Sequence, residues 1–529
     1  MTGDANSFDV AIVGGGVNGL VAAAMLAKAG RKVVLCEALE RFGGATGLST
    51  LAPGVRAPKC SHLVSGLPPA LIRKLKLKKH GLHVVQEKVG RLALDPDGRH
   101  IPFGSGRRLT REAIFQWSRH DADAWDAFNK RLDVLTQAML PMATGASPAL
   151  MPQTRQEKLV WIRHFARVRR KGRMVFQDVL KTLPSNAADF LEDAFETGLL
   201  KGALSFEAVL GGRHGPRAPG TMFSWAWQRA LEASTRKGTI QLAGGPDALA
   251  DALAIAARTY GAELRTSAQV ASINIADGCV TGFVLKNGDE ISAPVVVSAI
   301  GPKATYLDLV GARHLDAGLA RDISQIRMRG ASAKVNLALG KLPAFANATP
   351  DDLSARLIVA PSLEGVERAA DAPKYGELPA QAVMEVTLPS IRDESLAPEG
   401  RHVLSAIVPF VPFDRKGGWA DGADRLMADV IKTLGTYAPD LPDLVMAGEV
   451  LTPPDIESQC GLAGADWHQG ELTMDQALMM RPVPQLADFG GPVSGLYLGG
   501  AGAHPGGGLH GRPAMAAVSA ILGNGRRSR

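Results

Sequence analysis

Two short apolar runs near the N-terminus flank a glycine cluster and a helical stretch. The first run, residues 8–13 (FDVAIV), is typical of a buried parallel strand. Residues 20–29 are rich in alanine and leucine, which favour a helix, and Gly30 follows where helices often end. Residues 32–36 (KVVLC) form the second apolar run. This pattern predicts a strand, a helix and a parallel strand, the repeating unit of an α/β protein.

The turn between the first strand and the helix carries glycines at the spacing GxGxxG. Gly14 permits a tight turn, Gly16 lets the backbone approach a pyrophosphate, and Gly19 lets the helix pack closely on the strand. Glu37 lies 21 residues after Gly16, close to the distance at which an acidic residue binds ribose hydroxyls. The glycine spacing alone also fits an ordinary turn, but the complete succession favours a dinucleotide site. Its predicted residues are Gly14, Gly16, Val17, Asn18, Gly19, Glu37 and Ala38.

Two further glycine loops distinguish a flavin site from a nicotinamide site. The segment ERFGGATG follows Glu37, and a nicotinamide domain has no need for a second close backbone approach there. Near the C-terminus, a predicted strand at 495–498 leads through GGAGAHPGGGLHG into a predicted helix at 513–522. A glycine loop that leads into a helix N-terminus favours an anionic group. We therefore predict FAD, and these loops add Arg41, Gly43, Gly44, Ala45, Gly502, Gly508 and Leu509 to its binding residues.

The middle of the chain contains another α/β stretch, at residues 238–301. A helical segment at 246–261 precedes strands at 263–275 and 279–292, and the dipeptide Asn287–Gly288 indicates a hairpin. Residues 295–301 (VVVSAIG) form another predicted buried strand. The stretch is either a returning part of the FAD domain or an independent domain. Residues 100–235 and 311–485 contain no second GxGxxG unit, so we expect no separate nicotinamide site there.

Composition narrows the class of protein further. The 529 residues are 46% hydrophobic and 21% charged, which fits a multidomain globular protein. The four cysteines are far apart, which argues against a disulfide scaffold, a zinc ribbon and a dithiol centre, and we expect no metal site. The N-terminus has neither the basic nor the apolar region of a secretory signal, and no stretch reaches the ~18 apolar residues of a membrane span. We expect a cytoplasmic protein.

The two terminal motifs, GGGVNGLVAAAMLAKAG…RFGGATG and GLYLGGAGAHPGGG, resemble those of the FAD-dependent phytoene desaturase-related oxidoreductases. Within them the similarity is greatest to the branch named pyridine nucleotide-disulfide oxidoreductase domain-containing protein 2. Weaker likeness occurs near residues 60, 215, 245 and 470. The resemblance implies FAD and hydride abstraction from a substrate C–H bond. The redox disulfide that the branch name suggests is not expected, because the sequence has no spaced cysteine pair.

The resemblance also implies the α/β fold and its domain order. We expect a glutathione-reductase-type (Rossmann-like) discontinuous FAD domain with a mixed α/β substrate domain. FAD-binding segments at 1–99, 236–310 and 486–529 would alternate with substrate segments at 100–235 and 311–485. A backbone group at Val270 would hold the adenine, and Gly301 would lie at the cofactor.

The predicted function is dehydrogenation or desaturation of a hydrophobic, isoprenoid-, polyene- or lipid-like substrate, with oxygen or a quinone as electron acceptor. Three alternatives stay open: a flavin amine oxidase, a non-redox polyene isomerase and a catalytically idle flavoprotein that acts as a membrane adaptor. Three histidines are candidate catalytic residues: His504 in the C-terminal glycine loop, where it faces the flavin or braces the loop, and His62 and His468 in the expected substrate cavity. Asp475, Gln476 and Arg481 are further candidate cavity residues.

Residues 155–173 form a basic amphipathic segment, with eight Lys or Arg residues and one acid, Glu157. At helical spacing its apolar residues share one side and Arg163, Arg167, Arg170 and Lys171 share the other. Such a helix either docks on the protein core or lies on an anionic membrane surface, and a second basic run at 73–80 favours the membrane. The net charge of +7 permits anionic partners, but no nucleic-acid motif accompanies it, so we expect no nucleic acid. The peripheral contact would be with the inner membrane surface, and the oligomeric state is left open.

Overall fold

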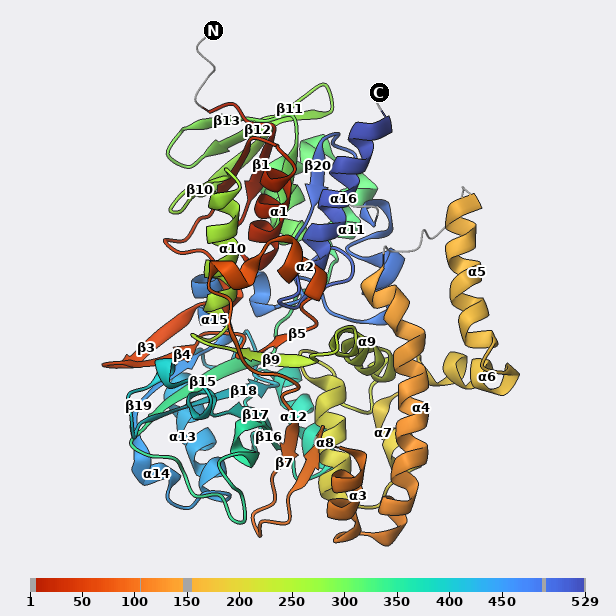
Figure 1. Cartoon of the computed structure of the whole chain (residues 1–529), viewed down its shortest axis with the longest axis vertical. Helices are drawn as coiled ribbons and strands as arrows, with labels where there is room; N and C mark the ends of the chain where they lie inside the picture. The colour runs from red at the N-terminus through yellow and green to blue at the C-terminus, as the bar shows by residue number, and fades with distance from the viewer. Residues whose placement is uncertain (1–5, 105, 146–154, 488–490, 528–529) are drawn as a thin grey trace.

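Strands from three distant parts of the chain form one parallel sheet. The computed structural model describes residues 6–104, 106–145, 155–487 and 491–527. The strand order in this sheet is β10-β2-β1-β14-β20, and all neighbours are parallel. The sheet lies in the upper half of Figure 1. Its strands are β1 (Val10–Val13), β2 (Val33–Cys36), β10 (Glu263–Arg265), β14 (Val296–Ser298) and β20 (Leu496–Leu498).

The two faces of this sheet pack against different layers, because successive side chains of a strand point to opposite sides. Val10 and Ile12 share one apolar cluster with the helices α1 (Val17–Lys28), α10 (Asp247–Thr259) and α16 (Arg512–Arg527). Ala11 and Val13 share another cluster with an antiparallel three-stranded sheet. That sheet consists of β11 (Val270–Ala276), β12 (Cys279–Leu285) and β13 (Glu290–Ser292). A glutathione-reductase-type FAD domain has this three-layer form, so the predicted fold class is confirmed.

A second, mixed sheet lies below the first in Figure 1. Its strand order is β19-β15-β18-β17-β16-β7-β8, and the pair β16–β7 is its parallel neighbour pair. The expected domain division placed residues 1–99 wholly in the FAD part, yet β7 pairs with β16 and β8 of the second sheet. The strand β8 lies in the expected substrate segment 100–235. The bounds are β7 (Arg91–Ala93), β8 (Ile101–Phe103), β15 (Ser332–Leu339), β16 (Arg356–Val359), β17 (Met384–Thr387), β18 (His402–Pro409) and β19 (Val445–Leu451).

A helical layer stands beside the second sheet, and its core contains a cluster of buried aromatic residues. Its core contains Trp125, Phe128, Phe206, Trp225 and Trp227, which pack among alanine and leucine side chains. The layer forms the lower right of Figure 1. Its helices are α3 (Arg107–Phe115), α4 (Arg119–Thr144), α7 (Ala187–Glu192), α8 (Gly198–Val209), α9 (Thr221–Ala233) and α12 (Leu363–Asp371).

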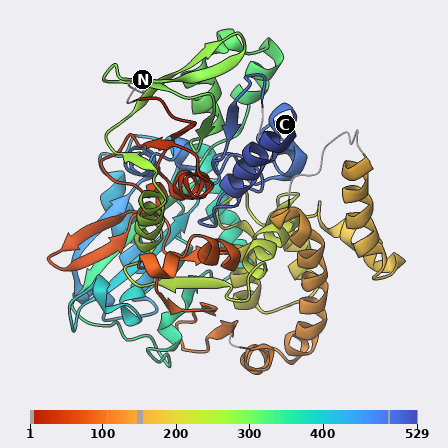
Figure 2. The ribbon, with the colours of Figure 1, turned by 45° about the horizontal axis from the view of Figure 1, so that its top comes forward.

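Two helices, α5 (Arg155–Arg169) and α6 (Arg173–Thr182), form a hairpin at the margin of the molecule. Both views show it at the edge, outside α4 (Figures 1 and 2). Ile162 and Met174 are exposed on it to 59% and 78%. Among the helices of the described residues, none is long and apolar enough to cross a bilayer.

The remaining elements connect these layers. The small sheets β3–β4 and β5–β9–β6 join the N-terminal unit to the lower sheet. The bounds are β3 (Leu48–Ala52), β4 (Val55–Pro58), β5 (Val64–Ser65), β6 (Val84–Gln86), β9 (Thr239–Leu242), α2 (Pro69–Lys74), α11 (Ala317–Ser324), α13 (Gly422–Gly435), α14 (Leu441–Leu444) and α15 (Pro453–Cys460).

Candidate functional site

A cavity of about 800 Å³ extends from the parallel sheet to the second sheet and the helical layer. Its upper part is lined by the turn after β1, the residues after β2, the start of β11 and the loop before α16. Its lower part is lined by residues of β7, β16, β17, α8 and α9. The predicted cofactor residues that line it are Gly14, Gly16, Val17, Asn18, Glu37, Ala38, Gly43, Gly44, Ala45, Val270, Gly301, Gly508 and Leu509.

The turn before α1 leaves room for a phosphate. Gly16 caps α1 without a side-chain hydrogen bond, and a Cβ atom built on it would meet no atom within 4 Å. The first turn of α1 carries no acidic residue that would repel an anion. By contrast, a Cβ atom on Gly19 would lie 1.9 Å from the carbonyl oxygen of Gly14, which shows how tightly the helix packs on the turn. This open cradle fits the pyrophosphate of FAD.

The carboxylate of Glu37 is fixed at the end of β2. Its two oxygens accept hydrogen bonds from the backbone N–H groups of Gly15, at 2.5 Å, and Leu39, at 2.9 Å. Glu37 lines the cavity, and the whole residue is 9% exposed. Each carboxylate oxygen has a further lone pair for a hydroxyl donor. Glu37 therefore fits the ribose of the adenosine half of FAD.

Three predicted cofactor residues lie outside the cavity lining. Gly19 contacts the turn itself, as described above. The side chain of Arg41 is 73% exposed and pairs with Asp247 at 3.0 Å. Gly502 packs against Pro302, whose Cδ would lie 2.5 Å from an added Cβ atom. Arg41 and Gly502 therefore support the surrounding loops.

Of the three candidate histidines, the structure brings His62 and His468 to the cavity and places His504 elsewhere. His504 is 1% exposed and packs edge-on against Trp227, with 5.9 Å between ring centroids. A different histidine, His510, lines the cavity beside Gly508. Burial and the charge of Arg512 lower the pKa of His510 to about 3, so its imidazole is neutral near pH 7. Sequence reasoning missed it, although it lies in the same glycine loop.

His62 belongs to a buried chain of hydrogen bonds. Its Nε2 lies 3.0 Å from Oε1 of Glu385, and its Nδ1 lies 2.9 Å from Nζ of Lys334. Burial and the charge of Lys334 lower the pKa of His62 to about 4, so the ring is neutral. Because an ionised carboxylate only accepts, Nε2 carries the proton, and Nδ1 accepts from the amine. Burial lowers the pKa of Lys334 to about 7.

The lower part of the cavity is lined by six paired charges, which we call the charged ladder. Arg91 pairs with Glu207 and, at 3.2 Å, with Glu232. Burial opposes ionisation of Glu232, but Arg356 and Arg91 outweigh it and lower the pKa to about 2. Burial likewise opposes ionisation of Glu207, but Arg91 and Arg229 outweigh it and keep the pKa of Glu207 below its ordinary value. The ladder consists, in order of contact, of Arg229, Glu207, Arg91, Glu232, Arg356 and Glu385.

Sequence reasoning missed the charged ladder, because its members come from five elements between residues 91 and 385. A signal was nonetheless present. The strands RLIV and MEVT each carry one charged residue in an otherwise apolar or neutral buried strand. A charge in a central strand is rare unless it is paired.

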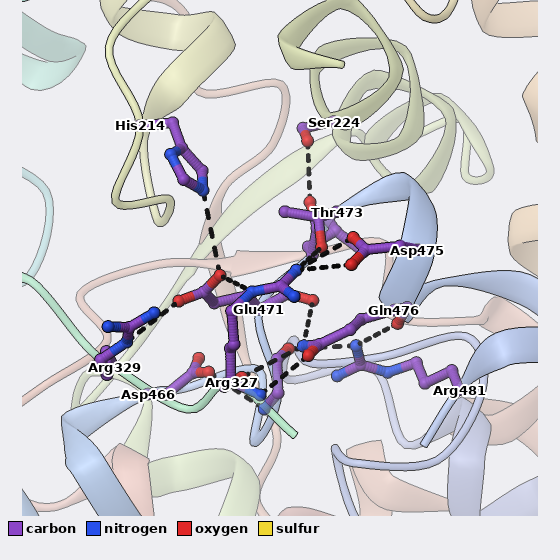
Figure 3. A network of polar contacts seen from close by, with 12 residues as sticks. His214, Ser224, Arg327, Arg329, Asp466, Glu471, Thr473, Asp475, Gln476 and Arg481 are labelled. Carbon is purple, nitrogen blue, oxygen red and sulfur yellow. Dashed lines mark hydrogen bonds and ion pairs between the residues drawn. The ribbon is translucent and has the colours of Figure 1, made fainter. Parts of the chain in front are cut away.

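The segment 466–481 is held in place by a polar network (Figure 3). Arg327 forms ion pairs with Glu471 at 3.0 Å and Asp475 at 2.9 Å, and its N–H donates to Gln476. Arg481, 1% exposed, donates to the carbonyl oxygens of Gly470, Gln476 and Ala501 at 2.9 to 3.2 Å. The candidates Asp475, Gln476 and Arg481 thus brace the loop that carries His468, and they do not line the cavity.

The cysteines are free thiols in the structure. Cys36, Cys60 and Cys460 are buried, and Cys279 is exposed. Burial raises the pKa of Cys60 to about 11 and that of Cys460 to about 12. These thiols are therefore protonated near pH 7 and poor nucleophiles.

The fold and the glycine-lined cavity define an FAD-dependent oxidoreductase, and residues 9–203 match the family described as FAD dependent oxidoreductase. The chain is 32% identical over 544 residues to "Pyridine nucleotide-disulfide oxidoreductase domain-containing protein 2" of Mus musculus, with 97% of this chain and 93% of the mouse protein covered. It belongs to the family of that protein.

Two further similarities are more distant. Over 272 residues, half of each chain, the protein is 30% identical to "Phytoene desaturase (neurosporene-forming)" of Rhodobacter capsulatus. The crystal structure of an oxidoreductase from Methanosarcina mazei superimposes with a TM-score of 0.61 at 16% identity, covering 97% of this chain and 99% of that one. The latter similarity concerns the fold alone. Together these findings confirm the predicted family resemblance and FAD as the cofactor.

Proposed function

We propose that the protein dehydrogenates a C–H bond of a hydrophobic, isoprenoid- or lipid-like substrate. FAD, when bound, supplies the hydride acceptor. The observation that carries the proposal is that one continuous cavity joins the glycine-lined cofactor half to a second half outside it. Apolar side chains line much of that second half and exclude water from a substrate chain. They are Phe206, Leu210, Leu231, Ile358 and Ile407.

Oxygen or a quinone would then take the electrons. The similarity to a protein named phytoene desaturase supports substrate dehydrogenation. A flavin amine oxidase is the weaker candidate, since such enzymes usually enclose the amine among aromatic side chains. Among the described residues that line the cavity, no tyrosine occurs. The isomerase and the idle adaptor differ from the dehydrogenase in one observable, net reduction of the flavin.

The decisive experiment is anaerobic mixing of the FAD-loaded protein with polyene and lipid candidates. A substrate should bleach the flavin absorbance and leave a product lighter by two hydrogens in the mass spectrum, and oxygen or a quinone should restore the absorbance. Leu210→Trp should slow bleaching at least tenfold with unchanged FAD content, because it fills the cavity, whereas Ile255→Trp on the exposed face of α10 should not. A flavin that no candidate reduces, although light reduces it, would refute the dehydrogenase and favour the isomerase or the adaptor.

We propose further that the α5–α6 hairpin contacts an anionic membrane surface, from which a hydrophobic substrate would be taken up. Leu159, Ile162, Met174 and Leu180 are all at least 45% exposed on this hairpin. Basic side chains surround them, and Arg163 and Arg167 are exposed on α5. An apolar stripe bordered by lysine and arginine is typical of helices that lie on anionic lipid.

A further inference from the structure

The charged ladder poses a problem for a substrate that is only a hydrocarbon. Its six side chains line the lower half of the cavity. The side chains of Glu232 and Arg229 each remain 25% accessible, and those of Arg91 and Glu207 14%. A hydrocarbon that displaced water from these surfaces could offer them no hydrogen bond. The ladder groups would keep their ion pairs, but their accessible N–H groups and carboxylate lone pairs would lose water without gaining a new hydrogen bond, which is unfavourable.

The ladder is also balanced in charge. Three arginines face three glutamates in alternation, and each glutamate is held by at least one arginine within 4 Å. Arginine stays protonated, and the pKa values of Glu207, Glu232 and Glu385 all lie below the ordinary value. The row therefore offers N–H donors and carboxylate acceptors side by side without a net charge.

The groups next to the ladder do not change this balance near the cavity. Beyond Glu385 stands His62, whose ring is neutral, and its Nε2 uses Oε1 of that carboxylate. Lys334 lies behind His62 and does not line the cavity. Thr239 donates to Oε1 of Glu232 at 2.7 Å and adds no charge. A ligand in this half therefore meets a neutral row of alternating donors and acceptors.

We infer that the substrate carries an uncharged head group that both donates and accepts hydrogen bonds, a hydroxyl or primary amide, and that this head lies against the charged ladder. The apolar remainder contacts the side chains of Phe206, Leu210 and Ile358 on the same cavity wall. This inference rests on the proposed function, and it narrows the substrate class from a hydrocarbon to a neutral amphiphile. A cationic or anionic head would meet a repelling neighbour on either side of its partner.

The inference is tested by binding, without turnover. Five probes with six carbons each, hexane, hexanol, hexanamide, hexanoate and hexylammonium, are equilibrated with the oxidised FAD-loaded protein by dialysis in sealed cells. We expect hexanol and hexanamide to bind at least tenfold more tightly than hexane and than either ion. A purely apolar cavity would give the opposite order for hexane and hexanol, because the hydroxyl would have to shed its water.

A charge change in the ladder locates the binding. Glu232→Gln leaves the ladder with one excess positive charge, so hexanoate should gain at least tenfold in affinity relative to hexanol. Glu192→Gln removes an exposed acid that pairs with Arg217 on the surface, and the order of the probes should stay unchanged. The FAD content and melting temperature of both variants are measured first. If Glu232→Gln does not fold, Glu207→Gln replaces it, and if neither folds, the order of probes in the unchanged protein decides.

The inference is overturned if hexane binds as tightly as hexanol, if neither hexanol nor hexanamide binds, or if a folded ladder variant shows the same preference as the unchanged protein. None of these results concerns hydride transfer. The dehydrogenase proposal fails separately, when no candidate substrate reduces the flavin.

Discussion

Lys334 should make the stability of the protein depend on pH in an unusual range. The residue is 1% exposed, and the pKa of its amine falls from 10.5 to about 7, chiefly because burial disfavours the charged form. Cys60 and Glu385 oppose this shift only in part. In the unfolded chain the amine keeps its ordinary pKa. Between about pH 7 and pH 10 the unfolded state therefore binds more protons than the folded state, and the free energy of unfolding rises with pH.

The size of the effect follows from the two pKa values. A full difference of one proton changes the free energy of unfolding by about 1.4 kcal/mol for each pH unit. Since the folded amine is already half deprotonated at pH 7, the gain from pH 7 to pH 9 is about 2 kcal/mol. Replacing Lys334 by methionine keeps an unbranched side chain and removes the titrating amine. The variant should lack this part of the rise.

The assay is urea unfolding of the FAD-loaded protein and of Lys334→Met at pH 7, 8 and 9. The difference between the two free energies isolates the amine, because other titrating groups contribute equally to both. Lys341→Met provides the control, since the side chain of Lys341 is 65% exposed in the loop after the same strand. The free energy of unfolding of this variant should differ from that of the unchanged protein by the same amount at all three pH values. A Lys334→Met difference that changes by less than about 0.5 kcal/mol from pH 7 to pH 9 would refute the reasoning.

Four further changes test other parts of the structure. Gly16→Val should lose FAD, because its methyl groups would fill the open cradle before α1, and a full flavin content in the purified variant would contradict the site. Burial lowers the pKa of His504 to about 4, so protonating it in acid costs stability. His504→Phe should therefore reduce the fall in the free energy of unfolding between pH 6.5 and pH 4, by at most about 3 kcal/mol. An equal dependence of the free energy of unfolding on pH in both proteins would contradict this. Replacing all four cysteines by serine should leave flavin reduction by substrate intact, and its loss in a folded, FAD-loaded variant would reveal a thiol relay. The double change of Leu159 and Ile162 to serine should weaken co-sedimentation with anionic vesicles, whereas Ile255→Ser should not. Equal co-sedimentation of the unchanged protein and the two variants would argue against membrane contact.

The cofactor half of the site could be predicted because its determinants are local in sequence. Gly14, Gly16 and Glu37 lie in one βαβ unit, where turn geometry, helix N-terminus and strand end are fixed by fewer than thirty residues. The same holds for the strand β20 and the glycine loop after it. Backbone approach to a phosphate requires glycine whatever the tertiary surroundings, so the sequence carries the signal directly.

The substrate half could not be predicted in this way. Arg91 and Glu207 meet because β7 joins the second sheet, although the family resemblance assigned residues 1–99 to the FAD part. His504 is a second example. Its position in a glycine motif suggested that it faces the flavin or braces the loop, and its ring packs on Trp227 of α9. In both cases long-range packing decides where the side chain points, and neither local periodicity nor spacing contains that information.

This difference between the two halves bears on how the family could diversify. The cofactor cradle depends on backbone geometry, so few substitutions are compatible with it. The charged ladder instead depends on side chains, which come from β7, β16, β17, α8 and α9. Removing one charge from the ladder leaves an uncompensated charge in a buried row, which is destabilising, whereas replacing a whole pair by apolar residues is often neutral. Substrate preference in this fold should therefore change by pairs, such as Arg229 with Glu207 at the end of the ladder, while the cradle around Gly16 stays the same.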